Sequence, residues 1–176
     1  MVRFLKFIAY MLFFLSMFLI FLPKENLFYQ VEKEAIKYDV YISKESIGEK
    51  LFGLKLHHAS ISYQGIQSAT IEEADFFLGL FYNEVVLKNI ELSSLVKNYW
   101  PQKISLCKFH YSVLDPLIIY GKAKGLFGKI DMHYNLQKRT IDIFLKPSKL
   151  MLKKYSSTLR YFKKLDNGEY RYEKTL

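Results

Sequence analysis

One apolar stretch near the start of the chain constrains its location more than any other feature. Between Phe4 and Leu22 the only charged residue is Lys6. A helix rises about 1.5 Å per residue, so this stretch can cross the roughly 30 Å hydrocarbon core of a bilayer. We therefore expect residues 1–23 to form a transmembrane anchor. Its lipid-facing side chains include Phe7, Leu12, Phe14, Phe18 and Phe21.

The charges around this stretch predict its orientation. Arg3 and Lys6 lie at its N-terminal side, and positive flanks favour the cytoplasm. We expect a single-pass inner-membrane protein with a cytoplasmic N-terminus and a periplasmic C-terminal domain. A secretory signal peptide has a shorter apolar region and a small-x-small cleavage site, which the sequence PKEN after Leu22 lacks. A cleaved signal is the alternative, and it predicts the same compartment.

Composition and charge describe the remainder of the 176-residue chain. The part after the anchor is long enough for one domain with its own core. Residues 1–100 carry 10 Lys and Arg against 11 Asp and Glu, whereas residues 101–176 carry 16 against 6. The basic half is expected to face anionic lipid, an acidic partner or solvent, and not nucleic acid, because the anchor exports it from the cytoplasm. Cys107 is the single cysteine and is expected to be a small buried hydrophobe.

Hydrophobic periodicity predicts a mainly β protein. Residues 24–37 follow a helical period and predict a juxtamembrane helix. Residues 38–176 then alternate with period two, which predicts a periplasmic domain built on a meander of about eight strands. A basic amphipathic helix is expected over 148–165, with a last strand after it. We expect the antiparallel sheet to curl into a trough with an apolar lining.

Two places along the meander predict local geometry. The alternation around Ile130 to Leu136 and again from Ile141 to Leu145 predicts an antiparallel hairpin with one apolar face. At His57-His58 the apolar positions change parity, which predicts a bulge or a tight turn.

The apolar run 74–82 (ADFFLGLFY) is too short to cross a membrane as a helix. A buried strand is one interpretation, and an edge that touches lipid or a partner is the other. In the second case the contact residues are Phe76, Phe77, Leu80 and Phe81.

The predicted helix 148–165 also allows two interpretations. Its apolar residues recur at helical spacing and are expected to cover the open end of the sheet core; they are Leu152, Tyr155, Leu159 and Phe162. Its basic residues either only solubilise it or bind anionic headgroups or an acidic partner. These are Lys149, Lys153, Lys154, Arg160, Lys163 and Lys164.

The sequence contains no recognisable catalytic, metal or cofactor motif. The four histidines (His57, His58, His110 and His133) lack metal-ligand spacing. The glycines of 121–128 do not precede a helix, so they are expected to let strands bend or pack closely and not to hold a phosphate. The acidic cluster 72–75 is expected to be a solvated edge. We expect no catalytic residue, no cofactor and no metal.

At the level of pattern the chain resembles the N component of bacterial type II secretion systems (GspN-like proteins) and, more remotely, AsmA-like proteins. The carrying features are the single anchor, the helix 24–37, the run GKAKGLFG at 121–128, the hairpin 129–145 and the ending KKLDNGEYRY at 163–172. The resemblance implies a non-enzymatic inner-membrane protein with a β-rich periplasmic domain that serves an envelope machine or lipid movement.

Two functions follow as hypotheses. The first is a scaffold that contacts other proteins of a trans-envelope machine, either a type II secretion-like system or a flagellar motor, because Tyr and Phe favour protein contacts. The second is a lipid-handling β-groove of the AsmA-like type, indicated by the apolar run 74–82. Neither needs a small-molecule substrate, and an enzyme is the third and weakest alternative.

Overall fold

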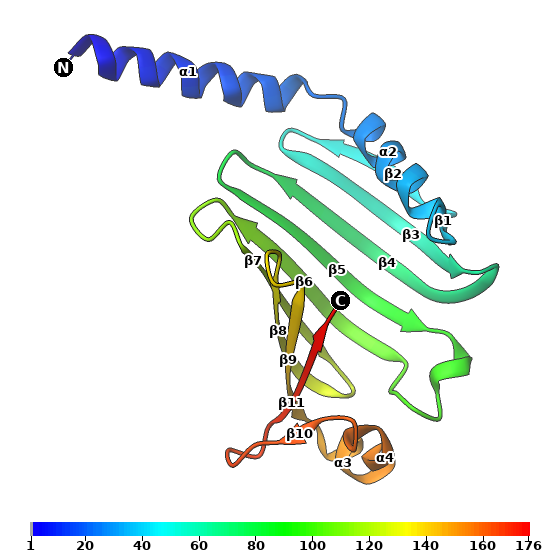
Figure 1. Cartoon of the computed structure of the whole chain (residues 1–176). Helices are drawn as coiled ribbons and strands as arrows, with labels where there is room; N and C mark the ends of the chain where they lie inside the picture. The colour runs from blue at the N-terminus through cyan, green and yellow to red at the C-terminus, as the bar shows by residue number, and fades with distance from the viewer. Residues whose placement is uncertain (1) are drawn as a thin grey trace.

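The computed structural model describes residues 2–176 and begins with two consecutive helices. Helix α1 (Val2–Phe21) extends away from the rest of the molecule, and none of its residues is buried (Figure 1). Within the described residues, α1 is the one helix long and apolar enough to cross a membrane. Helix α2 (Lys24–Ile36) follows directly, which confirms the helix expected over 24–37.

The rest of the chain is mainly β and forms one open antiparallel sheet, as expected. Residues 2–176 contain eleven strands in the order β1-β3-β4-β5-β6-β7-β8-β9-β11-β10, with β2 beside β1 on the edge of β3. The strands are β1 Val40–Ser43, β2 Ser46–Lys50, β3 Gly53–Tyr63, β4 Ile66–Leu78, β5 Tyr82–Leu92, β6 Lys103–Ser112, β7 Ile118–Gly125, β8 Gly128–Asn135, β9 Thr140–Pro147, β10 Lys163–Lys164 and β11 Tyr170–Thr175. From β3 to β9 every strand pairs with the next one in the sequence.

Strict alternation of apolar and polar residues predicted the β8–β9 hairpin, which the structure confirms. Strands β8 and β9 pair with Ile130 opposite Leu145 and Met132 opposite Ile143, so both apolar sets lie on the same face. Gly128 begins this hairpin at φ +119°, and a Cβ there would come within 2.1 Å of the Lys146 carbonyl oxygen. This confirms that the glycine allows a close approach of two strands.

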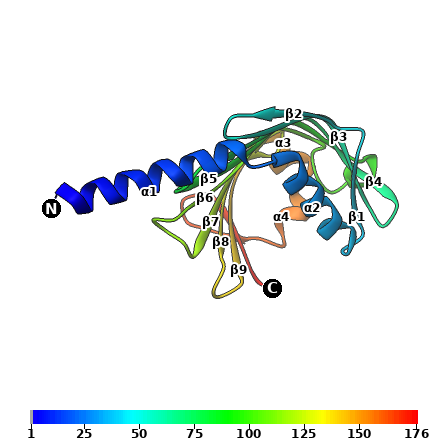
Figure 2. The same cartoon turned by 90° about the horizontal axis from the view of Figure 1, so that it is seen from above.

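A line of irregular residues crosses the sheet. His58 (φ 56°) and Asn89 (φ 51°) both have left-handed backbones, and the β6–β7 register shifts at Ser105. The Asn89 side chain donates a hydrogen bond to Glu72 on the strand between β3 and β5, at 2.7 Å. The parity change at His57-His58 marks the left-handed backbone of His58, but β3 keeps its register with β4 there, because His57 pairs with Glu73 and Ala59 with Ile71. The β3–β4 register shifts instead between Ile61 and Ser62, so the bulge expected at His57-His58 was misplaced. Bulges increase twist and bend strands, and Figure 2 shows the strongly bent sheet with α2, α3 and α4 on the inner side of the bend.

The single helix expected over 148–165 was wrong. Two short helices, α3 (Lys149–Lys154) and α4 (Ser156–Leu159), meet at Tyr155, which leaves the helical region at φ −119° and ψ 28°. Serine and threonine after Tyr155 are poor helix formers, and the Thr158 hydroxyl instead donates to the Tyr99 carbonyl. Lys163 and Lys164 form β10. Ser148 is the N-cap, as predicted, and accepts from the Met151 amide at 3.1 Å.

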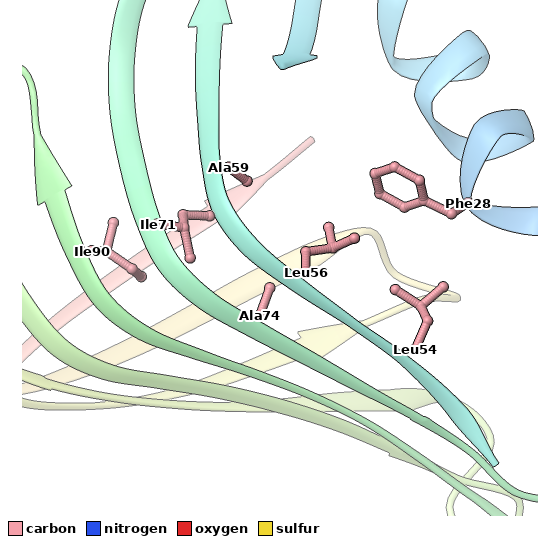
Figure 3. Close-up of a cluster of buried hydrophobic side chains, with 7 residues drawn as sticks. All are labelled: Phe28, Leu54, Leu56, Ala59, Ile71, Ala74 and Ile90. Atoms are coloured by element: carbon pink, nitrogen blue, oxygen red, sulfur yellow. The ribbon is translucent and has the colours of Figure 1, made fainter. Parts of the chain in front are cut away.

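Two clusters of buried side chains form the core. Figure 3 shows the first, in which Phe28 of α2 points toward Leu54 and Leu56 of β3. The second cluster contains the fully buried Leu145 together with Phe127 of the β7–β8 turn and Met151, Tyr155 and Leu159 of the α3–α4 segment. Ile104 packs against both clusters, so they form one apolar layer on one face of the sheet. We call this the inner face and the opposite one the outer face.

Candidate functional site

The inner face carries continuous apolar rows that run across the strands. Residues opposite each other in a ladder point to the same face. One row joins strands β3 to β9, and the next row lies two residues nearer the β4–β5 and β6–β7 turns. The first row is Leu56, Ala74, Leu87, Cys107, Ala123, Ile130 and Leu145, and the second begins Leu54, Phe76, Val85, Phe109 and Gly121.

The helices cover only the two ends of this face. Helix α2 contacts β1, β2 and β3, and α3 contacts β9. Between them an open apolar groove of about 510 Å³ lies along the middle strands. This volume is within the usual range of ligand sites, about 300–1,000 Å³. Its walls include Phe76, Leu87, Phe109, Tyr111 and Ile119.

Cys107 illustrates the apolar character of the inner face. It lies in the first row between Leu87 and Ala123, and burial raises the pKa of its thiol. The thiol therefore stays protonated and behaves as a small apolar side chain, but Cys107 is half-buried and not fully buried as expected. The groove offers apolar contact area, which suits an apolar ligand such as an acyl chain.

The outer face has a different character, because aromatic and histidine rings form a ladder across it. The rings of Tyr82, His110, Tyr120 and His133 follow one another with centroids 5.2–5.7 Å apart. Such cross-strand ring pairs stabilise a sheet. His110 and His133 therefore lie on the outer face, and the ladder accounts for their positions.

Ion pairs on the outer face shift several pKa values. The Glu84 carboxylate accepts hydrogen bonds from Lys108 and from the Tyr82 hydroxyl, and the bond to Glu84 raises the pKa of Tyr82 to about 12. Desolvation is the largest single effect on Glu84 and raises its pKa, but the hydrogen bonds from Lys108 and Tyr82 bring that pKa below its ordinary value.

The acidic cluster 72–75 is held by neighbouring strands. The Glu73 carboxylate lies 2.7 Å from the Lys88 ammonium and 3.0 Å from that of Lys55, which lower its pKa to about 2. Asp75 pairs with Lys50 at 2.5 Å. The expected solvated edge was therefore wrong, because β4 lies between β3 and β5 and these carboxylates are engaged by cations of the chain itself.

A second hollow, of about 730 Å³, lies along the line of irregular residues that includes His58, Asn89 and Ser105. Its lining is mixed, with Glu72, Asn89, Lys103 and Ser105 among its residues. Glu72 and Asn89 already bond to each other, so these polar groups are engaged within the chain. The apolar groove is the better candidate site.

The structure separates the four aromatic and aliphatic residues that the sequence grouped in 74–82. Phe76 and Phe77 both border the groove, but Phe77 follows Phe76 in the strand, lies opposite Glu84 and is exposed, whereas Leu80 and Phe81 lie outside the groove lining. The interpretation of 74–82 as one buried strand was wrong, because β4 ends at Leu78 and Leu80 and Phe81 form the turn to β5. The Gly79 amide closes this turn by donating to the Tyr82 carbonyl at 3.1 Å.

The six basic residues of 148–165 are exposed and lie far from α1. They follow β9, at the end of the sheet opposite the β4–β5 and β6–β7 turns, which we call the distal end (Figure 1). None of them takes part in the ion pairs of residues 2–176. The anchor residues Phe7, Phe14, Phe18 and Phe21 are exposed along α1, and Leu12 is half-buried.

Sequence reasoning missed most of the groove walls. Leu87, Phe109, Tyr111 and Ile119 come from three strands, and each occupies an ordinary alternating position. The signal was present as the apolar parity of β5, β6 and β7, but that parity does not distinguish a covered face from an open one.

Comparison of the chain with protein-family models, with curated proteins and with solved structures found no match. The resemblance to GspN-like and AsmA-like proteins therefore stays a prediction.

Proposed function

We propose that this protein is a membrane-anchored, non-enzymatic lipid-binding protein whose bent sheet serves as a trough for an acyl chain. The observation that carries the proposal is the open apolar groove between α2 and the α3–α4 pair. Each buried methylene contributes about 0.8 kcal/mol, so ten of them contribute about 8 kcal/mol before the cost of ordering the chain.

The proposed location follows from α1 and its charges. An apolar helix of 20 residues with Arg3 and Lys6 in its first two turns suits a single-pass anchor with a cytoplasmic N-terminus and a periplasmic sheet domain. The lipid would then come from the membrane that holds the protein, because the domain begins directly after α1.

Photo-crosslinking tests the proposed lipid site. A photoreactive phenylalanine analogue at position 111 would lie in the groove wall, whereas the same group at position 133 would lie on the outer face and serve as the matched control. In intact membranes we expect lipid adducts from the analogue at 111 and few from that at 133. Equal lipid labelling at both positions, or labelling at neither, would contradict the proposal.

A scaffold in a trans-envelope machine is the second candidate, favoured by the basic residues of the distal end. Exposed lysines without ion-pair partners in the chain suit an acidic partner protein, as in a secretion system or a flagellar motor. Replacing Lys149, Lys153 and Lys154 by glutamine should release salt-sensitive partners that the unchanged protein retains in mild detergent. Recovery of the unchanged protein as a lone monomer would argue against this function.

A further inference from the structure

The turns at one end of the sheet form an apolar edge. Consecutive strands are antiparallel, so alternate turns lie at the same end. We call this edge the proximal rim. It consists of residues 51–52, 79–81, 113–117 and 136–139, which connect β2–β3, β4–β5, β6–β7 and β8–β9.

Backbone hydrogen bonds join these turns into one row. Each bond links a turn to the next one along the rim. The bonds run from the Leu78 amide to the Phe52 carbonyl at 2.7 Å, from Val113 to Phe81 at 2.9 Å and from Leu136 to Leu117 at 2.8 Å. The rim is therefore a continuous feature of the sheet and not a set of independent loops.

Large apolar side chains of the rim are open to the surroundings. Leu114 is 92% exposed, Leu51 is 59% and Phe81 is 57%. The turn 79–81 contains no charged residue. The other turns add charge at the margin of these side chains, because 113–117 contains Asp115 and 136–139 contains the exposed Lys138 and Arg139. Exposed apolar side chains bordered by polar residues mark an interaction site.

The connection between α1 and α2 lies at this same end of the sheet. The Glu25 amide, in the first turn of α2, donates to the carboxylate of Glu49, which lies just before the β2–β3 turn. The buried Lys24 ammonium donates to the carbonyls of Ile20 and Leu22, so it caps the last turn of α1. Figures 1 and 2 both show the β4–β5 and β6–β7 turns on the side from which α1 departs.

We propose that the proximal rim inserts its apolar side chains into the interface of the bilayer that α1 spans. Placement beside the end of the anchor selects this occupant over a soluble protein. The inference rests on the proposed membrane anchor, but it does not require a lipid in the groove. The distal basic residues do not share this contact, because β9, whose eight residues separate them from the rim, spans about 26 Å at ~3.3 Å per residue.

This placement also gives the groove an entrance. Leu78, Tyr111 and Ile119 line the groove and lie beside the rim turns. An acyl chain could therefore move from the bilayer into the groove without crossing water.

Tryptophan fluorescence of the full chain in liposomes tests the rim. The native Trp100 is replaced by phenylalanine, and one tryptophan is introduced as L114W or F81W. The matched control is Y161W, because Tyr161 is 79% exposed near the distal end. With acyl chains brominated near the headgroup, we expect blue-shifted, quenched emission from L114W and F81W, and red, unquenched emission from Y161W.

Three other results have separate meanings. Loss of the protein from liposomes after alkaline washing would refute the anchor and the rim together. Retention with emission from L114W and F81W like that of Y161W would refute the rim alone. A blue shift without bromine quenching would mean that a second copy or another protein covers the rim, which also overturns the proposal.

Quenching should persist in a Phe109→Ala background, since it does not depend on groove occupancy. If W100F lowers stability, the same comparison is made with Trp100 kept and its emission subtracted.

Discussion

Replacing Phe109 by alanine should weaken lipid binding by roughly 30-fold. Phe109 lies in the groove wall opposite Val85 and Gly121. A bound acyl chain that covers about half of this side chain removes roughly 80 Å² from water. At ~25 cal/mol per Å² the lost contact corresponds to about 2 kcal/mol, or roughly 30-fold in Kd.

The matched control is Phe144→Ala. Phe144 is also a half-buried strand residue, but it lies on the outer face between His133 and Arg171. Both changes remove the same atoms and should lower the stability of the sheet similarly. Only Phe109→Ala should change affinity for lipid.

The assay is a titration of a phospholipid with a fluorescent acyl chain into each full-length protein in micelles of constant composition. Unfolding by denaturant is measured on the same samples, so that loss of fold is not read as loss of binding. Equal affinities of the Phe109 and Phe144 variants, both folded, would refute the groove as the lipid site.

Three further changes test the architecture. Glu73 has a folded pKa of about 2, below its ordinary value of 4.5, so the stability from its ion pairs is present above pH 4.5 and is lost as pH falls toward 2. In acid unfolding curves, the Glu73→Gln protein should therefore lose less stability between pH 4.5 and pH 2 than the unchanged protein. An equal loss in both proteins would contradict the ion pairing of Glu73. Leu145→Ala should lower the free energy of unfolding by about 2–5 kcal/mol, because Leu145 is fully buried, whereas the exposed Leu150→Ala should change it by less than about 0.5 kcal/mol; denaturant titrations giving equal values would be inconsistent with the second core cluster. Ser148→Ala should cost about 1 kcal/mol by the same measurement, because it removes the cap of α3; a neutral effect would show that the cap is dispensable.

Patterns within short segments of the sequence predicted the elements that depend mainly on interactions between neighbouring residues. The β8–β9 hairpin followed from strict alternation, and the parity change at His57-His58 indicated the left-handed backbone of His58. The helix 24–37 followed from spacing, and α2 ends one residue earlier at Ile36.

The error over 148–165 also has a physical reason. The spacing of Leu152, Tyr155 and Leu159 fits one continuous helix, yet the buried residues are Met151, Tyr155 and Leu159, and Leu152 is exposed. Packing against the end of the sheet selected a broken helix over the periodic one. Sequence periodicity contains no information about the surface against which a helix packs.

The groove and the rim depend on contacts between distant parts of the chain. Leu56, Ala74, Leu87 and Cys107 become neighbours only through the strand register. Whether that row stays open depends on how much of it α2, α3 and α4 cover. The sequence predicted the exposed basic residues of 148–165, but their distance from α1 depends on the strand topology.

Native mass spectrometry of the full chain, extracted from its own membrane in mild detergent, tests the central claim most directly. The account predicts the mass of the chain plus a lipid that dissociates on collisional activation and is reduced in the Phe109→Ala protein. A folded chain that carries no lipid, or one whose lipid is unaffected by changes in the groove wall, would contradict it.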